Sequence, residues 1–194
     1  QTNYAKPWLA EIHLNEDNVP HPILRHELVH ALASSFATGP LRVPARMGVL
    51  VAGGIVVGLG VAIEPPRGEW TVHEWTRAMR ELGVMPPLAQ LVRPTGFFAA
   101  APARAYTVAG SFIKYLIDKH GPAQVRSAYG DGDFHRAFGR PLAALEKEWD
   151  GFLSGIAVPP ALKAAAEERF REGSLFERQC AREVAALEER ASRA

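Results

Sequence analysis

Two histidines and a glutamate lie close together near the start of the chain, in the order His26-Glu27-Leu28-Val29-His30. Residues four apart share one face of a helix, so both imidazoles can bind the same zinc ion. Glu27 would then lie beside the metal, where a carboxylate can take a proton from bound water. In 194 residues with seven histidines, chance gives roughly 0.02 matches to H-E-x-x-H. The motif predicts a zinc site on His26 and His30 with Glu27 as general base. The alternative is a pair of surface histidines beside a solvated glutamate.

A catalytic zinc ion needs a third protein ligand as well as an open position. No histidine follows His30 at the spacing H-E-x-x-H-x-x-G-x-x-H, which excludes the metzincin pattern. The remaining option is a glutamate from the next helix. Glu64 is the one carboxylate between His30 and Glu69, so it is the candidate third ligand.

Hydrophobic spacing and helix-ending residues predict a mainly helical chain with one short N-terminal strand at 10–14. The zinc motif falls in a helix that starts at Pro22 and ends at Gly39-Pro40. Thr71 and Glu74 have the spacing of a capping box, which predicts a helix from there to about Leu82. Residues 85–102 are typical of a loop. Further helices are expected at 103–120, 123–129, 134–138 and 141–153, and two more in 161–194, broken near 173–174.

The longest apolar run, 47–63, needs its own explanation because 17 residues reach the lower limit for a membrane span. It contains five glycines, which allow helices to approach closely. Packing as a buried helix is therefore the favoured interpretation, and membrane association is not favoured.

The chain resembles a gluzincin zinc metallopeptidase domain of the peptidase MA-like kind, similar in layout to thermolysin and the aminopeptidase N group. In such proteins a helix after H-E-x-x-H carries E-G-x-A, whose glutamate is the third zinc ligand. Residues 57–64 here read V-G-L-G-V-A-I-E, so Val57 takes the ligand position and Gly60 that of the small residue. Valine cannot bind zinc. Glu64 lies about two turns, roughly 10 Å, further along the same helix, and can be the ligand only if that helix is shifted. Its alternative role is a solvent-facing carboxylate at a helix end.

The resemblance continues in 106–116, Y-T-V-A-G-S-F-I-K-Y-L, which is similar to the family's Y-x-x-G/A-x-x-F-x-x-x-L helix. It implies that Tyr106 donates a hydrogen bond to the oxyanion of a tetrahedral intermediate. A core tyrosine with a satisfied hydroxyl is the alternative. Residues 139–149 resemble the family's closing helix. In all, the resemblance covers about residues 10–155, and the zinc motif is its specific part.

Composition and charge narrow the other possibilities. A formal net charge of +1 gives no support for a nucleic-acid partner. The single cysteine, Cys180, excludes an internal disulfide and a cysteine-based zinc site. After Pro159 the composition shifts to Ala, Glu and Arg, so we expect a metallopeptidase-like domain at 1–158 and a helical appendage at 159–194. His73 and His135 lack a partner at metal-ligand spacing and are interpreted as surface or capping residues.

Two functions remain open from the sequence. The first is a zinc-dependent peptidase acting on a peptide or protein substrate. The second is a catalytically degraded peptidase-like domain that serves binding or assembly, and Val57 motivates it. An extracytoplasmic location is implied by the resemblance alone, and the sequence indicates no oligomeric state.

Overall fold

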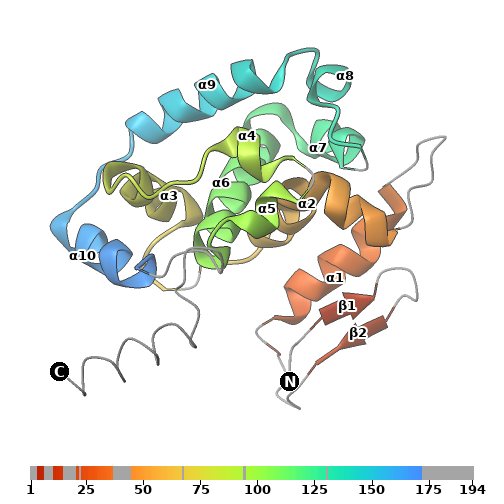
Figure 1. Ribbon diagram of the computed structural model, residues 1–194, viewed down its shortest axis with the longest axis horizontal. Coiled ribbons are helices and arrows are strands. Elements are labelled where there is room, and N and C mark those ends of the chain that lie inside the picture. Colours follow the sequence, from red (N-terminus) through yellow and green to blue (C-terminus); the bar gives the residue numbers. More distant parts are fainter. Residues whose placement is uncertain are drawn as a thin grey trace, which may run out of the picture.

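The computed structural model describes residues 4–6, 11–14, 21, 23–36, 45–66, 68–93, 95–129 and 131–171. Within them the chain is mainly helical, as the sequence predicts, and carries one small sheet (Figure 1). In chain order the elements are β1 (Tyr4–Lys6), β2 (Glu11–His13), α1 (Leu24–Ala33), the 3-10 turn η2 (Ser34–Phe36), α2 (Ala45–Ala62), α3 (Val72–Glu81), α4 (Leu88–Leu91), α5 (Gly96–Ala99), α6 (Pro102–His120), α7 (Pro122–Ala128), α8 (Phe134–Phe138), α9 (Leu142–Ser154) and α10 (Pro160–Arg169).

The sheet is an antiparallel pair of short strands that packs beside α1. Tyr4 lies opposite His13, and Lys6 opposite Glu11. The predicted strand is β2, whereas its partner β1 lies in a segment for which the sequence predicted no element. Figure 1 shows the pair next to α1 at one end of the molecule. The sheet therefore borders the helix that carries the zinc motif.

Helices α2 and α6 form the centre of the fold, and glycines bring them into backbone contact. A Cβ on Gly58 would lie 2.7 Å from the carbonyl oxygen of Ala109, and one on Gly110 would lie 2.3 Å from Cγ1 of Val61. Real Cβ atoms essentially never come this close, so both positions require glycine. The prediction that the apolar run packs as a buried helix is confirmed over 54–62. Among the described residues, no helix has the length and apolar character needed to cross a bilayer.

Helix α3 begins with the predicted capping box. The backbone N–H of Glu74 donates to Oγ1 of Thr71 at 3.3 Å, and the backbone N–H of Thr71 donates to the Glu74 carboxylate at 2.7 Å. These bonds satisfy N–H groups that a helix start otherwise leaves without partners. The cap fixes where α3 begins, and the helix packs against α6 and α10.

The later helices surround this centre. Trp149 of α9 is fully buried against Phe112 of α6, with ring centroids 5.5 Å apart.

The prediction of a loop at 85–102 is partly wrong, because this segment contains the short helices α4 and α5. Helix α10, in the segment expected to be an appendage, packs against α3 and buries Leu162 and Ala166 in the common core. The second helix expected in the tail lies outside the described residues.

Candidate functional site

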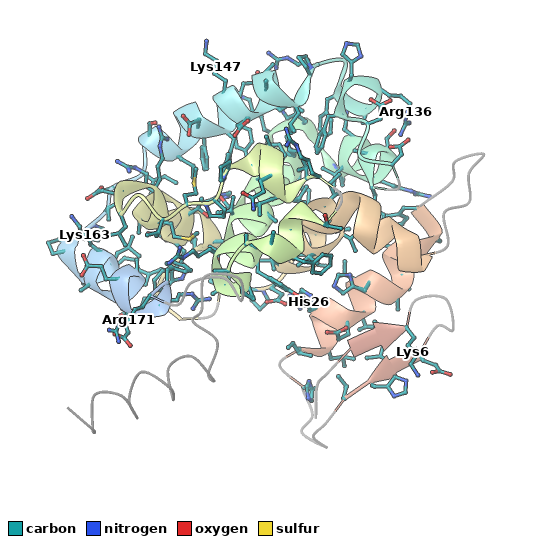
Figure 2. The ribbon with its side chains drawn as sticks, in the orientation of Figure 1. Lys6, His26, Arg136, Lys147, Lys163 and Arg171 are labelled. Carbon is teal, nitrogen blue, oxygen red and sulfur yellow. The ribbon has the colours of Figure 1, made fainter. Side chains whose placement is uncertain are left out.

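Helix α1 places His26 and His30 one turn apart, and their rings meet. The two Nε2 atoms lie 3.0 Å apart, and the ring centroids are 4.7 Å apart at an interplanar angle of 76°. His26 is buried and His30 is partly buried, so a pair of surface histidines does not describe this site. In Figure 2, His26 is labelled where α1 meets the helical body. The arrangement brings two imidazole nitrogens to one point, as the motif predicts.

Glu64 reaches this pair from the end of α2. Its Oε1 lies 2.7 Å from Nδ1 of His26, and its side chain is only 12% exposed. The solvent-facing alternative for Glu64 is therefore wrong. The carboxylate contacts the ring nitrogen of His26 that does not face His30. In a neutral imidazole ring, an Nδ1–H that donates to a carboxylate leaves the lone pair on Nε2.

Gly60 makes room for the His26 ring. A Cβ at this position would lie 2.6 Å from Cε1 and 2.7 Å from Nδ1 of His26. The resemblance implies a small residue at position 60, and in this chain the place of the His26 ring explains why glycine is needed there. Val57, one turn earlier, is buried at 6% exposure within the apolar core. It gives the site no polar atom.

Glu27 is buried beside the histidines, at 7% exposure. Burial raises the pKa of its carboxyl group, and the nearby Glu64 raises it further, while His26 and a backbone hydrogen bond from Ala5 of β1 act in the opposite direction. A raised pKa makes the carboxylate a better proton acceptor. Strand β1 therefore helps to hold Glu27, the candidate general base.

Burial also sets the charge state of His30. Desolvation and the neighbouring His26 lower its pKa to about 4, although Glu64 acts to raise it. His30 is consequently neutral at pH 7. A neutral imidazole is the form that binds a metal ion.

Tyr106, from α6, lies over the same site. Its ring is stacked on that of His26 at a centroid distance of 6.4 Å, and the residue is 40% exposed. Desolvation and Glu27 raise the pKa of its hydroxyl group, so the group keeps its proton at neutral pH. Such exposure does not match the alternative of a core tyrosine. Its position allows the hydroxyl to donate a hydrogen bond to a bound molecule.

A cavity of about 530 Å³ opens at this site. His26, Glu27, Glu64 and Tyr106 line one part of it. Other parts of its lining come from α3, α6, α10 and the segment between α2 and α3, and include Trp70, His73, Trp75, Lys114 and Arg169. His26, Glu27 and Glu64 thus border a space large enough for part of a peptide, whereas His30 is not one of the residues that line it.

Sequence reasoning missed the polar groups on α3 and α6 that share this cavity. His73, interpreted as a surface or capping residue, is hydrogen-bonded through Nδ1 to Oγ of Ser111 at 2.9 Å. Lys114 and Asp118 form an ion pair one helical turn apart, at 2.5 Å. His73 precedes Ser111 by 38 residues, so no local spacing in the sequence could relate them.

The donor set fits a metal ion only in part. His26 and His30 offer two nitrogens at one point, and Glu64 orients the first of them, which is the arrangement that metal-binding histidines commonly have. Within the described part of the chain, however, no three His, Cys, Asp or Glu side chains are grouped so that they could hold a metal ion. A metal bound here would be held by two protein nitrogens, with its other positions left to water or substrate.

Comparisons with protein-family models, curated proteins and solved structures gave no significant match to this chain.

Proposed function

We propose that this chain is a zinc-dependent peptidase of the gluzincin type, with His26 and His30 as metal ligands. The observation that supports it most is that the Nε2 atoms of His26 and His30 lie 3.0 Å apart near the buried Glu27, and that His26 and Glu27 line a cavity. When bound, zinc supplies Lewis acidity, which polarises a carbonyl group and makes a coordinated water easier to deprotonate.

The protein's own residues perform the proton transfers in this proposal. Glu27 accepts a proton from the attacking water, helped by the raised pKa of its carboxyl group, and passes that proton to the leaving amine. Tyr106 donates its hydroxyl proton in a hydrogen bond to the oxygen that becomes negative. Glu64 keeps His26 in one orientation throughout, through the contact at Nδ1.

The substrate in this proposal is a peptide or protein. The proposal also includes an extracytoplasmic location, for which the family resemblance is the support.

The test compares Glu27→Gln with Glu69→Gln, a matched change at an exposed glutamate outside the cavity lining. Zinc content is measured by elemental analysis, and hydrolysis with a quenched fluorescent casein. We expect Glu27→Gln to retain zinc and to lose at least about 100-fold in hydrolysis, the usual contribution of a general base. Glu69→Gln should leave both unchanged. Equal cleavage by wild type and Glu27→Gln would remove Glu27 from the mechanism.

A second function, a peptidase-like domain that has lost catalysis and serves binding or assembly, is favoured by one observation. Val57 is buried in the core where the resemblance expects a ligand, and Glu64 contacts Nδ1 of His26 rather than the nitrogen that faces His30. Two histidines alone hold zinc weakly. Wild-type protein that retains no zinc after soaking and dialysis, and hydrolyses no casein, would favour this second function.

A further inference from the structure

Three helices are connected by hydrogen bonds that end at the cavity. Nε1–H of Trp149, on α9, donates to Oγ of Ser111, on α6, at 3.2 Å. The same oxygen lies 2.9 Å from Nδ1 of His73, on α3. Trp149 and Ser111 are fully buried, whereas His73 lines the cavity shared with Glu27 and Tyr106. The connection therefore runs from the core to the cavity wall.

The chemistry of these groups determines which nitrogen of His73 carries its proton. An indole N–H can only donate, so the Ser111 oxygen accepts from Trp149. Within the described residues the Ser111 hydroxyl has no acceptor other than His73, so its hydrogen is directed to Nδ1. In a neutral His73 ring with Nδ1 as acceptor, the proton is on Nε2.

The Nε2–H group of His73 is a hydrogen-bond donor that a ligand in the cavity can use. Within the described residues no hydrogen bond to Nε2 is found, and His73 is a partly exposed residue in the lining of the cavity. Desolvation and the positive charge of Lys114 lower the pKa of His73 to about 4, against weaker effects of Asp118 and Glu74. The ring therefore stays neutral at pH 7 and presents one fixed, uncharged donor.

We propose that His73 is a substrate-binding residue whose Nε2–H donates a hydrogen bond to a main-chain carbonyl oxygen of a peptide in the cavity. An uncharged donor suits an uncharged acceptor, because a phosphate or carboxylate gains more from a cation. Trp70, Trp75, Pro65 and Pro66 line the same cavity, and their apolar surfaces can pack against a neighbouring side chain of the peptide. The inference rests on the proposed function only in taking a peptide as the occupant, and it requires no hydrolysis.

The binding test uses the full chain carrying Glu27→Gln, so that the probe is not cleaved. The probe is the blocked dipeptide N-acetyl-Leu-Phe-amide, and calorimetry gives its Kd. In this background, His73→Phe removes the donor but keeps a ring, His73→Gln keeps an N–H donor, and His135→Phe changes an exposed histidine outside the cavity lining. We expect His73→Phe to weaken binding about fivefold, the usual value of one net hydrogen bond. His73→Gln should restore most of that loss, and His135→Phe should have no effect.

A second measurement separates binding from a structural role and does not depend on any variant folding. Nitrogen NMR of the histidine rings should show the proton of His73 on Nε2, and addition of the dipeptide should shift that resonance. A proton on Nδ1, an unshifted Nε2 at saturation, or full affinity in a folded His73→Phe variant would overturn the inference. So would failure of the dipeptide to bind at millimolar concentration. His73-dependent binding by a wild-type protein that hydrolyses nothing would instead reject the peptidase and keep the inference.

Discussion

Glu64 and His30 contact opposite nitrogens of the His26 ring. Oε1 of Glu64 lies 2.7 Å from Nδ1, while Nε2 of His30 lies 3.0 Å from Nε2. Glu64 therefore contacts the ring on the side away from the point where the two histidines meet. A carboxylate in this place fixes the tautomer and the orientation of a metal-binding histidine. This relation separates two roles for Glu64: orientation of His26, or the direct metal binding that the sequence predicts.

Substitutions of Glu64 by glutamine and by alanine distinguish orientation of His26 from direct metal binding. An amide oxygen can still accept the Nδ1–H of His26, so we expect Glu64→Gln to keep most of the zinc affinity of wild type. Glu64→Ala loses this acceptor and should weaken zinc binding by about 10- to 100-fold, as is typical when the partner of a metal-binding histidine is removed. Competition with a chromophoric zinc chelator measures both. If Glu64 were a direct ligand, the neutral amide would be nearly as damaging as alanine.

Val57→Glu tests whether the family's ligand position is still in reach of the metal. Val57 is buried at 6% exposure, so an unpaired carboxylate there should lower the free energy of unfolding by about 3 kcal/mol or more. If the new carboxylate reaches the histidine pair, added zinc should recover stability, and zinc should bind more tightly than in wild type. Thermal unfolding with and without zinc checks this.

Val56→Glu is the matched control for that change. Val56 is equally buried at 6%, but its side chain leaves α2 about 100° around the helix from that of Val57. We expect the same loss of stability without recovery by zinc. Equal behaviour of the two variants would place residue 57 out of reach of the metal.

Much of the fold was predictable because its signals are local. The Thr71–Glu74 capping box, the glycine-rich apolar run and the His26–His30 spacing each act within a few residues, and all are found in the structure. Strand β1 was missed because a three-residue strand has little periodicity and depends on β2 and α1 for its place. Helices α4 and α5 were missed because four residues are too few to show a helical pattern.

The candidate site was predictable only where its residues are neighbours in sequence. His26, Glu27 and His30 follow one helix, and Glu64 was found because no other carboxylate lies between His30 and Glu69. Its contact with Nδ1 was not predictable, since that depends on how α2 lies against α1. His73 and Ser111 are brought together by the packing of α3 on α6, and no spacing rule could have revealed that pairing.

Gly60→Ala should disturb the metal site directly. The added Cβ would lie 2.6 Å from Cε1 of His26, so the ring has to leave the position in which it contacts Glu64 and His30. We expect zinc affinity to fall at least about tenfold, as for loss of histidine orientation, with a loss of stability of about 1–3 kcal/mol from overpacking. Chelator competition and urea unfolding measure these effects.

Gly151→Ala is the control for Gly60→Ala. Gly151 lies within α9, and a Cβ there would meet nothing within 4 Å. Alanine at this position should leave zinc binding unchanged and raise stability by about 0.5–1 kcal/mol, because glycine disfavours a helix interior. Unchanged zinc affinity in Gly60→Ala would show that the His26 ring does not depend on this space.

His73 should make stability depend on pH in a defined window. Its pKa is about 4 in the folded protein, against 6.5 for an unperturbed histidine, and Lys114, Asp118 and Glu74 are the charged groups that act on it. Well above pH 6.5 the ring is neutral in both states and contributes no pH dependence. Between about 6.5 and 4 the unfolded chain binds a proton that the folded chain does not, so the free energy of unfolding falls as the pH falls.

His73→Gln lacks this titration, and its stability should therefore decline less than that of wild type as the pH is lowered from 7.5 to 4.5. Urea unfolding of both proteins at several pH values gives the difference. His30, whose pKa is also lowered to about 4, titrates in both proteins and cancels in the comparison. His135→Gln, at an exposed histidine, should follow wild type. Parallel curves for wild type and His73→Gln would mean that His73 is protonated as readily in the folded chain as in the unfolded one, and that burial does not keep its ring neutral.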